Sequence, residues 1–361
     1  MKEMQTRLFR WVLVILCLTF LLGSISTSAE AESGKLEVWF LDVGQADAAL
    51  VLCDGHSMLI DGGNAADSGK MYSFLKNHGI TELDYVIATH AHEDHVGGLA
   101  GALNYARAKA AYCPVDSYDS KAFQNFAKAV ERNGISITVP QKGITFALGD
   151  GECRILAVNT GSDINNTSIV LRITYGDTSF LFTGDGEREV EQAILDSGAE
   201  IRSTVLKVGH HGSETSTGYL WLREVMPQYA VISVGKDNSY GHPTDEVLSR
   251  LRDAEVTTFR TDLQGDIACV SDGKTVTFTV SRNRDADVFA SVGPNSTQQE
   301  TQNQIPKADA QTYVLNTNTH KFHNPDCRSV GQMKEKNKSY FTGSREEVIA
   351  KGYSPCGNCR P

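Results

Sequence analysis

The stretch that decides the fold is Thr89-His90-Ala91-His92-Glu93-Asp94-His95-Val96-Gly97-Gly98, which places four potential metal ligands within six residues. Imidazole binds metals near neutral pH and a carboxylate adds a hard oxygen, but crowding these groups gains nothing unless a cation compensates. The apolar residues 85–88 precede this stretch, and two glycines end it, as at a turn from a strand into a helix. The pattern therefore predicts a metal-binding turn rather than a solvated polar loop.

Other apolar strand patterns also end in polar side chains. One ends in Asp185, a second in His210 and His211, and a third leads into the loop that contains His242. A single carboxylate at a strand end is more often a turn former or a helix cap. Several such endings in chain order favour a site that is assembled from separate parts of the chain.

Strand and helix patterns alternate along the first three quarters of the chain. We expect strands over residues 36–42, 57–61, 85–89, 154–158, 168–175, 179–183, 204–208 and 229–234. We expect helices over residues 68–77, 96–106, 120–133, 187–196, 217–224 and 245–253. Turns at Gly176-Asp177 and Asp272-Gly273 are typical of hairpins. Sheets covered by helices on their outer faces define the α+β class, here as a four-layer αββα sandwich.

The length of 361 residues exceeds that of a typical domain. Residues 283–310 are rich in Asp, Asn, Ser, Thr and Gln, which predicts a flexible linker between a large core domain at 34–282 and a small module at 311–361. The formal net charge is −10, so the chain as a whole does not attract nucleic acid. Such a partner would have to be held by metal ions or by small basic patches.

The N-terminus is typical of an export signal, predicted over residues 1–31. Three basic residues precede the apolar residues 11–22, and Ala29-Glu30-Ala31 offers a cleavage site. The apolar run is short for a membrane span of roughly 20 residues, although an uncleaved anchor is the alternative. We therefore expect an exported protein that is secreted or associated with the cell surface.

Cysteines fall into two groups. Four of them lie singly in apolar, strand-like surroundings and are expected to be buried thiols: Cys53, Cys113, Cys153 and Cys269. At the C-terminus, His323, Cys327, Cys356 and Cys359 supply the four tetrahedral ligands that structural zinc prefers. Disulfides among these three cysteines would leave one thiol unpaired.

With these motifs the chain resembles the metallo-β-lactamase superfamily, and more narrowly the soluble hydrolase domain of the ComEC family of competence proteins. The narrower resemblance covers nearly all of residues 36–280 and rests on Leu-Asp-Val-Gly-Gln-Ala-Asp at 41–47, Leu-Ile-Asp-Gly-Gly at 59–63, Asn-Asn-Thr-Ser at 165–168, Lys207 with His-His-Gly-Ser at 210–213, and Tyr-Gly-His-Pro at 240–243. No polytopic membrane channel accompanies these motifs in this sequence, so DNA translocation is not implied. The last residues resemble an Ada-like metal-binding module, a kind that often accompanies secreted nucleases.

Ligand roles follow from the spacing and the resemblance together. His90 and His92 lie two residues apart in extended chain and can grip one metal. Asp94, His95 and His210 would hold a second metal, and Asp185 would bridge the pair. Two metals so bridged would lower the pKa of a shared water. The hydroxide so formed would be the nucleophile, held by the metals that Asp94 and the other ligands bind. Zinc fits the histidine-rich set, and manganese also fits it by residue type.

One ligand of the wider superfamily is missing, because residues 163–168 read Asp-Ile-Asn-Asn-Thr-Ser where a histidine is usual. Asn166 or water could complete the first metal, although a simple turn explains the two asparagines equally well. The count of core metals is therefore one or two.

The remaining candidates surround the ligands. The resemblance makes Asp61 a support that orients a metal-binding histidine, with Asp42 also following a strand. Asp47 is either such a support or an ordinary loop carboxylate. Lys207 and His211 would meet an anionic substrate, or lie at the surface. His242, on a rigid loop, is the candidate for protonating the leaving group or contacting phosphate.

The leading hypothesis is an exported metal-dependent phosphodiesterase or nuclease that acts on DNA or another nucleic acid. A second hypothesis is an esterase for phosphocholine or for another ester or lactone of the cell surface. A third is a protein without catalysis that binds nucleic acid through its C-terminal module.

Overall fold

The computed structural model describes residues 34–290, 311–343, 345, 348, 353–356, 358 and 359. The predicted signal peptide lies outside the described residues. The chain divides into two compact units, Met1–Asn295 and Ser296–Pro361, and each is described by itself. Among the helices that the structure describes, none has the length and apolar character needed to cross a membrane.

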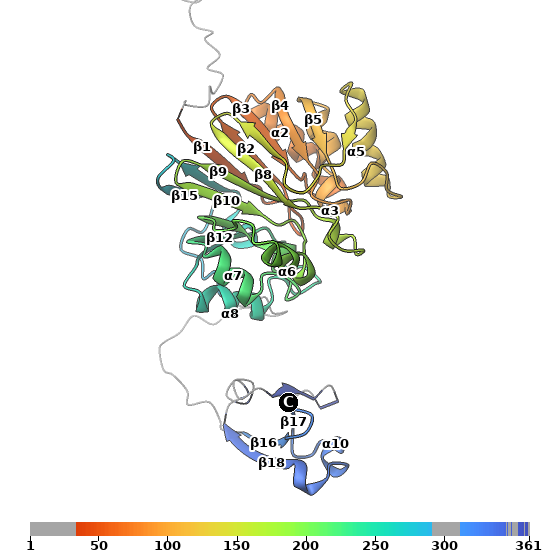
Figure 1. Ribbon diagram of the computed structural model, residues 1–361, viewed down its shortest axis with the longest axis vertical. Helices are drawn as coiled ribbons and strands as arrows, with labels where there is room; N and C mark the ends of the chain where they lie inside the picture. Colours follow the sequence, from red (N-terminus) through yellow and green to blue (C-terminus); the bar gives the residue numbers. More distant parts are fainter. Residues whose placement is uncertain are drawn as a thin grey trace, which may run out of the picture. The chain divides into compact units, whose positions relative to one another are not determined.

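The first sheet of the larger unit has the strand order β15-β14-β1-β2-β3-β4-β5-β6 (Figure 1). Its strands are β1 (Leu36–Phe40), β2 (Ala49–Cys53), β3 (His56–Ile60), β4 (Glu82–Ile87), β5 (Arg107–Tyr112), β6 (Ile137–Thr138), β14 (Ile267–Ser271) and β15 (Val276–Val280). The strands from β3 to β6 pair in parallel, and the others pair antiparallel. Parallel pairing brings the carboxyl ends of β3 and β4 to one edge of the sheet, which is where Asp61 and the residue 89–98 turn lie.

The second sheet has the order β13-β12-β11-β10-β9-β8-β7. Its strands are β7 (Thr145–Leu148), β8 (Gly151–Ala157), β9 (Val170–Tyr175), β10 (Thr178–Phe182), β11 (Val205–Lys207), β12 (Tyr229–Ile232) and β13 (Thr257–Arg260). The strands from β10 to β13 are parallel, so the loops after β10, β11 and β12 also meet at one edge. The predicted hairpin turns are confirmed, because β9 pairs antiparallel with β10 and β14 with β15.

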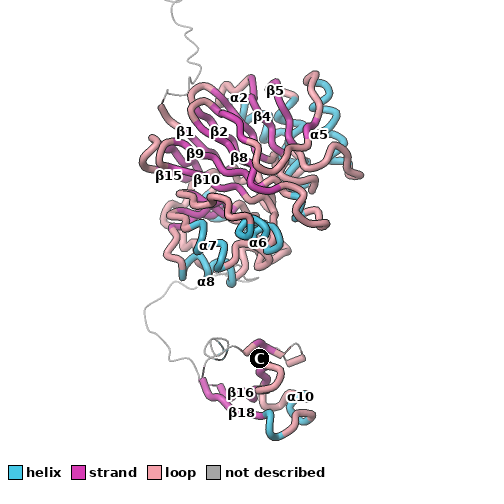
Figure 2. The backbone as a smooth tube through the Cα atoms, in the orientation of Figure 1, coloured by secondary structure: helices cyan, strands magenta, loops and turns pink. Residues whose placement is uncertain are grey.

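The helices cover the outer faces of the two sheets (Figure 2). They are α2 (Ser68–Asn77), α3 (Glu93–Val96), α4 (Leu99–Leu103), α5 (Lys121–Arg132), α6 (Arg188–Asp196), α7 (Tyr219–Val225), α8 (Asp245–Asp253) and α9 (Thr261–Gln264), with short 3-10 turns η1 (Ala65–Asp67), η2 (Asn165–Thr167) and η3 (Gly209–Gly212). In α5, the Ser120 hydroxyl accepts a hydrogen bond from the Phe123 N–H at the N-terminus, and Phe123, Phe126 and Val130 lie buried at helical spacing.

Three apolar cores fill the spaces between these layers. One core joins α2, α4 and α5 to the first sheet, a second joins the facing sides of the two sheets, and a third joins the second sheet to α6, α7 and α8. β10 is buried at every position because one face meets the other sheet and the opposite face meets helices. The predicted four-layer αββα sandwich is confirmed. The four predicted core thiols are buried and free, and burial raises the pKa of Cys113 to about 12.

The helix expected over residues 96–106 is wrong in its bounds. Two short helices, α3 and α4, meet there at Gly97-Gly98. A Cβ atom at Gly98 would lie 1.9 Å from the backbone oxygen of Gly62, so only glycine allows the two loops to touch. The Gly62 N–H donates to the His95 carbonyl at 2.7 Å, and this contact fixes the metal-binding turn against the end of β3.

Residues 283–290, which composition assigns to the linker, contact the larger unit. The buried Arg260 guanidinium donates to the Val288 carbonyl at 3.0 Å and to the Ala290 carbonyl at 2.9 Å. Phe289 packs against the core beside α8, with Arg252 over its ring. The polar composition hides these anchors because most of them are backbone carbonyls. The rest of the predicted linker lies outside the described residues.

The smaller unit has a sheet with the order β18-β16-β17-β19. Its elements are β16 (Gln311–Asn316), β17 (Lys321–His323), α10 (Arg328–Gly331), η4 (Glu335–Asn337), β18 (Lys338–Gly343) and β19 (Ser354–Pro355). Its apolar core is small and contains Tyr313, Leu315, Phe322 and Val348. A core of this size supplies little free energy of folding, so such modules usually need a metal or disulfides.

Candidate metal centre

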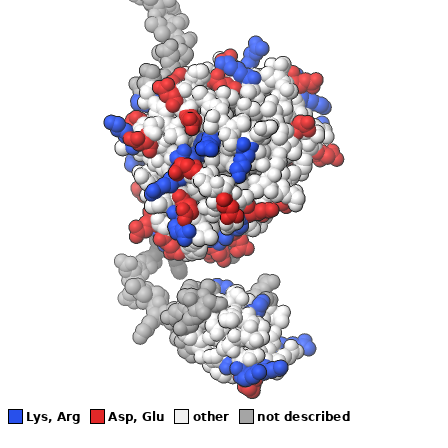
Figure 3. Space-filling view, in the orientation of Figure 1, with Lys and Arg blue, Asp and Glu red and all other residues white. Residues whose placement is uncertain are grey.

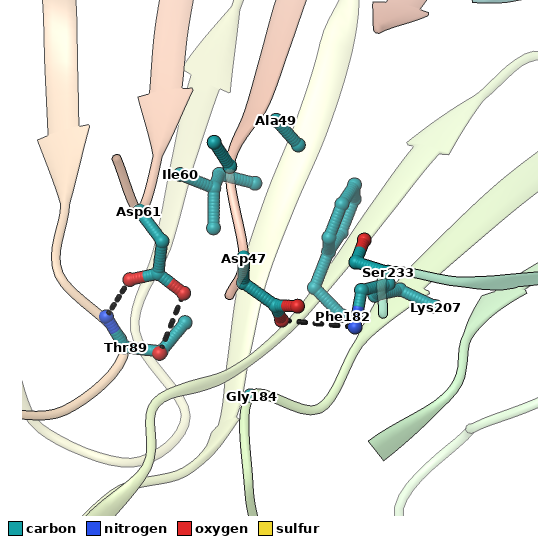
Figure 4. Close-up of a pocket in the computed structure, with 10 residues that line it drawn as sticks. Asp47, Ala49, Ile60, Asp61, Thr89, Phe182, Gly184, Lys207 and Ser233 are labelled. Atoms are coloured by element: carbon teal, nitrogen blue, oxygen red, sulfur yellow. Dashed lines mark hydrogen bonds and ion pairs between the residues drawn. The ribbon is translucent and has the colours of Figure 1, made fainter. Parts of the chain in front are cut away.

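Asp61 fixes the orientation of the predicted ligand His95. Its carboxylate accepts hydrogen bonds from the Thr89 N–H and hydroxyl, both at 2.7 Å (Figure 4). The same carboxylate lies 2.9 Å from His95 Nδ1. Because the carboxylate holds Nδ1, the opposite nitrogen, Nε2, faces the loops at the carboxyl ends of the strands of the second sheet. The structure thus places Asp61 where a carboxylate that orients a metal ligand should lie.

Four side chains from three loops converge on one point. Asp94, His95, Asp185 and His211 each offer a ligand atom, and these atoms all lie within 4.8 Å of one another. His95 Nε2 and Asp185 Oδ1 lie 3.3 Å apart, and both are buried without a hydrogen-bond partner. A cation shared by two residues requires two ligand atoms with free lone pairs that face each other. These two atoms meet that requirement, so the residues fit a metal ion.

The electrostatics of this cluster also favour a cation. Burial by itself would raise the pKa of Asp94, but His95 and His211 outweigh it and lower that pKa to about 2. Asp185 is fully buried, yet His95 and His211 hold its pKa well below the ordinary value of a carboxyl group. Both carboxylates are therefore ionised near neutral pH. The same carboxylates raise the pKa of His95 well above its ordinary value and that of His211 to about 10, so a bound metal ion would take the place of the protons on these two imidazoles.

His211, and not His210, completes this set of four. His211 Nε2 lies 3.3 Å from Asp94 Oδ2 and 3.6 Å from Asp185 Oδ2. The His210 side chain is 22% exposed, against 2% for His211, and its Nε2 lies 3.8 Å from Asp185 Oδ2. The structure thus brings His211, rather than the predicted His210, into the four-ligand cluster, and His210 lies at the edge of that cluster.

The backbone explains the exchange. His210 and His211 have φ angles of 49° and 53°, so two successive residues adopt the left-handed conformation that is costly for side chains other than glycine. This turn after β11 sends the second imidazole inward. His211 Nδ1 lies 3.0 Å from the Ser233 carbonyl, which holds the ring in place.

His90 and His92 form the other half of the centre. His90 Nε2 lies 3.0 Å from His92 Nδ1, so both nitrogens face one point, and His90 Nε2 lies 3.9 Å from Asp185 Oδ2. Burial holds the pKa of His90 well below its ordinary value, which keeps its lone pair free. Asp185 thus lies beside both ligand sets, as expected of a bridging carboxylate.

Asn166 does not reach the centre. Its Oδ1 accepts from the Glu187 N–H at 3.0 Å, and its Nδ2 donates to Glu189 at 3.1 Å. The amide is occupied in joining η2 to the start of α6, so its prediction as a ligand or substrate contact is wrong. Its neighbour Asn165 lines the cavity instead, together with His92 and Asp185.

Lys207 is buried and is not among the residues that line the cavity at the metal ligands. Its Nζ lies 2.9 Å from Asp47 Oδ2 and donates to the Val208 carbonyl at 2.9 Å (Figure 4). The predicted catalytic role of Lys207 is wrong because the side chain points between the two sheets from β11. Asp47 in turn lies 3.2 Å from His211 Nδ1, so this carboxylate supports a ligand.

Asp42 lies away from the centre. Its carboxylate pairs with Arg282 at 2.9 Å, and its N–H donates to Asp266 at 2.8 Å. The prediction of Asp42 as a support for the metal site is wrong. The residue instead ties the end of β1 to the segment that follows β15.

A cavity of about 340 Å³ opens onto the ligands. It is lined by Gln45, His92, Glu93, Asp94, Asn165, Asp185, His210, His211, Tyr240 and His242. His242 Nδ1 lies 3.3 Å from Gln45 Nε2, and its ring stacks on Tyr240 with the centroids 5.7 Å apart. Sequence reasoning missed Gln45 and Tyr240 as lining residues, although both lie in motifs that carry the family resemblance.

His242 is neutral at the pH where His usually titrates. Burial, followed by the neighbouring His210, lowers the pKa of His242 to about 4. An imidazole with this pKa carries no extra proton at neutral pH, so it suits a hydrogen bond to the substrate better than protonation of a leaving group.

The smaller unit brings together the four predicted ligands of its own. The ligand atoms of His323, Cys327, Cys356 and Cys359 all lie within 4.8 Å of one another, and the three cysteines are free thiols. His323 Nδ1 is buried without a hydrogen-bond partner. Three thiols and an imidazole in one shell fit a tetrahedral metal ion rather than disulfides.

Comparison with known proteins agrees with both sites. The Metallo-beta-lactamase superfamily matches residues 41–236, and this match covers more than half of the chain, so the chain belongs to that superfamily and has the fold of a metal-dependent hydrolase. The metal binding domain of Ada matches residues 296–361.

The chain is similar to competence-related proteins. It is 31% identical to ComE operon protein 3 of Bacillus subtilis (strain 168) over 268 residues, which are 69% of this chain and 34% of that protein. It is 30% identical to Competence protein ComA of Neisseria gonorrhoeae over 261 residues, 71% of this chain and 34% of that protein. The chain thus spans about a third of the length of these relatives. Among solved structures, the metallo-beta-lactamase fold protein YhfI from Bacillus subtilis aligns with 14% identity and a TM-score of 0.45, over 68% of this chain and 100% of that one.

Proposed function

We propose that this protein is an exported phosphodiesterase that cleaves nucleic acid, with DNA as the leading substrate. The observation that carries the proposal is the position of Asp185, whose Oδ1 lies 3.3 Å from His95 Nε2 and whose Oδ2 lies 3.9 Å from His90 Nε2 and 3.6 Å from His211 Nε2, so that the carboxylate is close to both ligand sets. Two cations that share a carboxylate are suited to in-line displacement at phosphorus, because both the attacking and the leaving oxygen can be stabilised.

The chain's own residues prepare the site for this chemistry. Asp61 orients His95, and Asp47 with the Ser233 carbonyl orients His211. When bound, the cations supply Lewis acidity and lower the pKa of a nearby water. We propose zinc for the core, with manganese as the alternative, and zinc for the thiol-rich shell of the smaller unit.

The cavity supports a nucleotide as the substrate. Tyr240 is 71% exposed at its rim, where an aromatic ring can stack on a base. Gln45 and the neutral His242 offer hydrogen bonds for a phosphodiester, and His210 lies beside them. On the face of the larger unit shown in Figure 3, acidic and basic side chains alternate without a broad basic surface, so local contacts at the cavity would carry the affinity.

The names of the relatives point the same way. Two are named for competence and for recombination, Competence protein ComA of Neisseria gonorrhoeae and Recombination protein 2 of Haemophilus influenzae. Both terms concern DNA, which supports nucleic acid over other phosphodiesters.

A phosphocholine ester is the second candidate, and the same Tyr240 favours it. An exposed aromatic ring also attracts a quaternary ammonium group through its π-face. The two candidates therefore differ in the group that Tyr240 would contact.

The test is an assay of the mature protein, beginning at Glu32, on single- and double-stranded DNA, RNA, bis-p-nitrophenyl phosphate and p-nitrophenyl phosphorylcholine, in zinc and in manganese. We expect cleavage of DNA and of the simple diester, and loss of both in Asp185→Asn. Cleavage of the phosphorylcholine ester alone would replace nucleic acid with the second candidate. Fractionation of cells that express the full chain, with N-terminal sequencing, tests export and cleavage after Ala31.

A further inference from the structure

The half of the centre at His90 and His92 has fewer protein ligands than the other half. Among the side chains that the structure describes, no group of three His, Cys, Asp or Glu ligands contains both of these histidines. The carboxylate that lies within 4 Å of this pair in the described part of the chain is Asp185, whose Oδ2 is 3.9 Å from His90 Nε2. A cation held by two imidazoles and a shared carboxylate would depend on a further donor from the chain or from solvent.

Asn165 has an unused oxygen at this place. Its Oδ1 is buried and has no hydrogen-bond partner. The residue lines the same cavity as His92 and Asp185. Leaving a buried amide oxygen unpaired is unfavourable, so this oxygen is available to a partner that the protein chain itself does not supply.

The backbone holds Asn165 where it is. Its N–H donates to Asp163 Oδ1 at 2.9 Å, and it begins the 3-10 turn η2. The next residue, Asn166, turns the other way and is bound to Glu187 and Glu189. Of the two adjacent asparagines, Asn165 therefore lines the cavity and Asn166 holds the fold together.

We propose that the Asn165 side-chain oxygen is a ligand of the cation at His90 and His92. The amide is neutral, as an imidazole ligand is, so the charge of the ligand set does not depend on which of the two is present. An amide oxygen is a harder donor than imidazole, so this half of the centre should favour manganese over zinc more than a three-histidine site does. The inference concerns the metal centre and does not depend on the nature of the substrate.

The experiment compares the mature full chain with Asn165→Ala, Asn165→His and the control Asn104→Ala. Asn104 is an exposed asparagine whose Oδ1 accepts from Arg132 at 3.1 Å, outside the cavity. Bound zinc and manganese are measured by mass spectrometry after dialysis at defined free metal, and thermal unfolding reports the fold. The metal of the smaller unit is common to all variants.

We expect Asn165→Ala to lower the affinity for one core cation by at least about 10-fold. Loss of a residue that only supports a metal ligand already costs about that much, and loss of a ligand should cost no less. Asn165→His should restore that cation and raise the ratio of zinc to manganese, while Asn104→Ala should match the parent. The proposal is overturned if Asn165→Ala keeps both core cations with parental affinity, including the case in which only diesterase activity falls. If Asn165→Ala fails to fold, Asn165→His by itself tests the proposal. In that case an unchanged ratio of bound zinc to manganese in Asn165→His overturns it. Because the readout is metal content, failure of the nuclease hypothesis leaves this result intact.

Discussion

Lys207 Nζ and Asp47 Oδ2 form an ion pair of 2.9 Å in which both side chains are about 95% buried. The pair lies beneath the metal centre, and Asp47 also faces His211 Nδ1 at 3.2 Å. The small space around it, about 10 Å³, has room for roughly one water molecule. The ammonium group therefore balances a carboxylate that supports a metal ligand.

Lys207→Met should destabilise the larger unit by about 3–5 kcal/mol, because it removes the ammonium partner of the buried Asp47 carboxylate. Urea unfolding measures this change. Lys236→Met, at an exposed lysine, is the matched control and should shift the free energy of unfolding by less than about 0.5 kcal/mol. A change in Lys207→Met no larger than in the control would mean that the pair does not stabilise the fold. The double variant Lys207→Met with Asp47→Leu should recover most of the stability but not the metal affinity, since His211 then lacks its carboxylate partner.

His211→Ala should remove one core metal ion, whereas His210→Ala should keep it. The reason is that His211 lies within the four-ligand cluster and His210 lies partly exposed at its edge. Metal content per chain separates the two variants. The opposite result would restore His210 as the ligand and would mean that the turn after β11 rearranges around the metal.

Asp185→Asn should weaken the binding of both core cations, because this carboxylate lies near both ligand sets. We expect diesterase activity to fall by at least about 100-fold. Removing a residue that only supports a metal ligand costs up to about that much, and Asp185 is proposed to be a ligand itself. The isosteric change keeps the shape of the side chain but removes its charge, so thermal unfolding of the apo protein is measured beside metal content to show that the variant still folds. Loss of activity with full metal content would instead give Asp185 a role in contacting the substrate.

Cys356→Ser should remove one zinc ion per chain and unfold the smaller unit, because metal binding supplies most of the folding free energy of such a module. Hydrolysis of a small diester should continue at the parental rate, since the core ligands belong to the larger unit. Ser339→Ala in the same module is the control. Equal zinc content in the variant and the parent would contradict a zinc site there.

Glu191 should make stability depend on pH between about 4.5 and 7. Burial is the largest influence and raises the pKa of this carboxyl group to about 7, against the N–H groups of Gly218 and Thr217 that bond to it. An acid with a raised folded-state pKa stabilises the fold fully below its unfolded pKa, and this contribution is lost as the pH rises through the folded value. The expected loss is on the order of 3 kcal/mol. Urea unfolding at pH 5 and pH 8 should show it in the parent and a much smaller change in Glu191→Gln.

The sequence by itself determined the class of fold and the place of the site. The periods of apolar residues separated strands from helices, and the motifs at 90–95 and at Asp185 both follow strands, which predicted a site assembled from strand ends. The spacing of His323, Cys327, Cys356 and Cys359 likewise defined a shell without any knowledge of the chain's path.

Tertiary structure alone decided between neighbouring residues. The sequence cannot distinguish His210 from His211, or Asn165 from Asn166, because each pair has the same chemistry and adjacent positions. Backbone angles decide which side chain enters the cavity, and at His210 and His211 these angles lie in a region that local sequence does not predict. The predicted roles of Lys207 and Asp42 differ from their places in the structure for a related reason. A charged residue at a strand end is expected to face solvent or substrate, and only its distant partner, Asp47 or Arg282, shows that it is held within the fold.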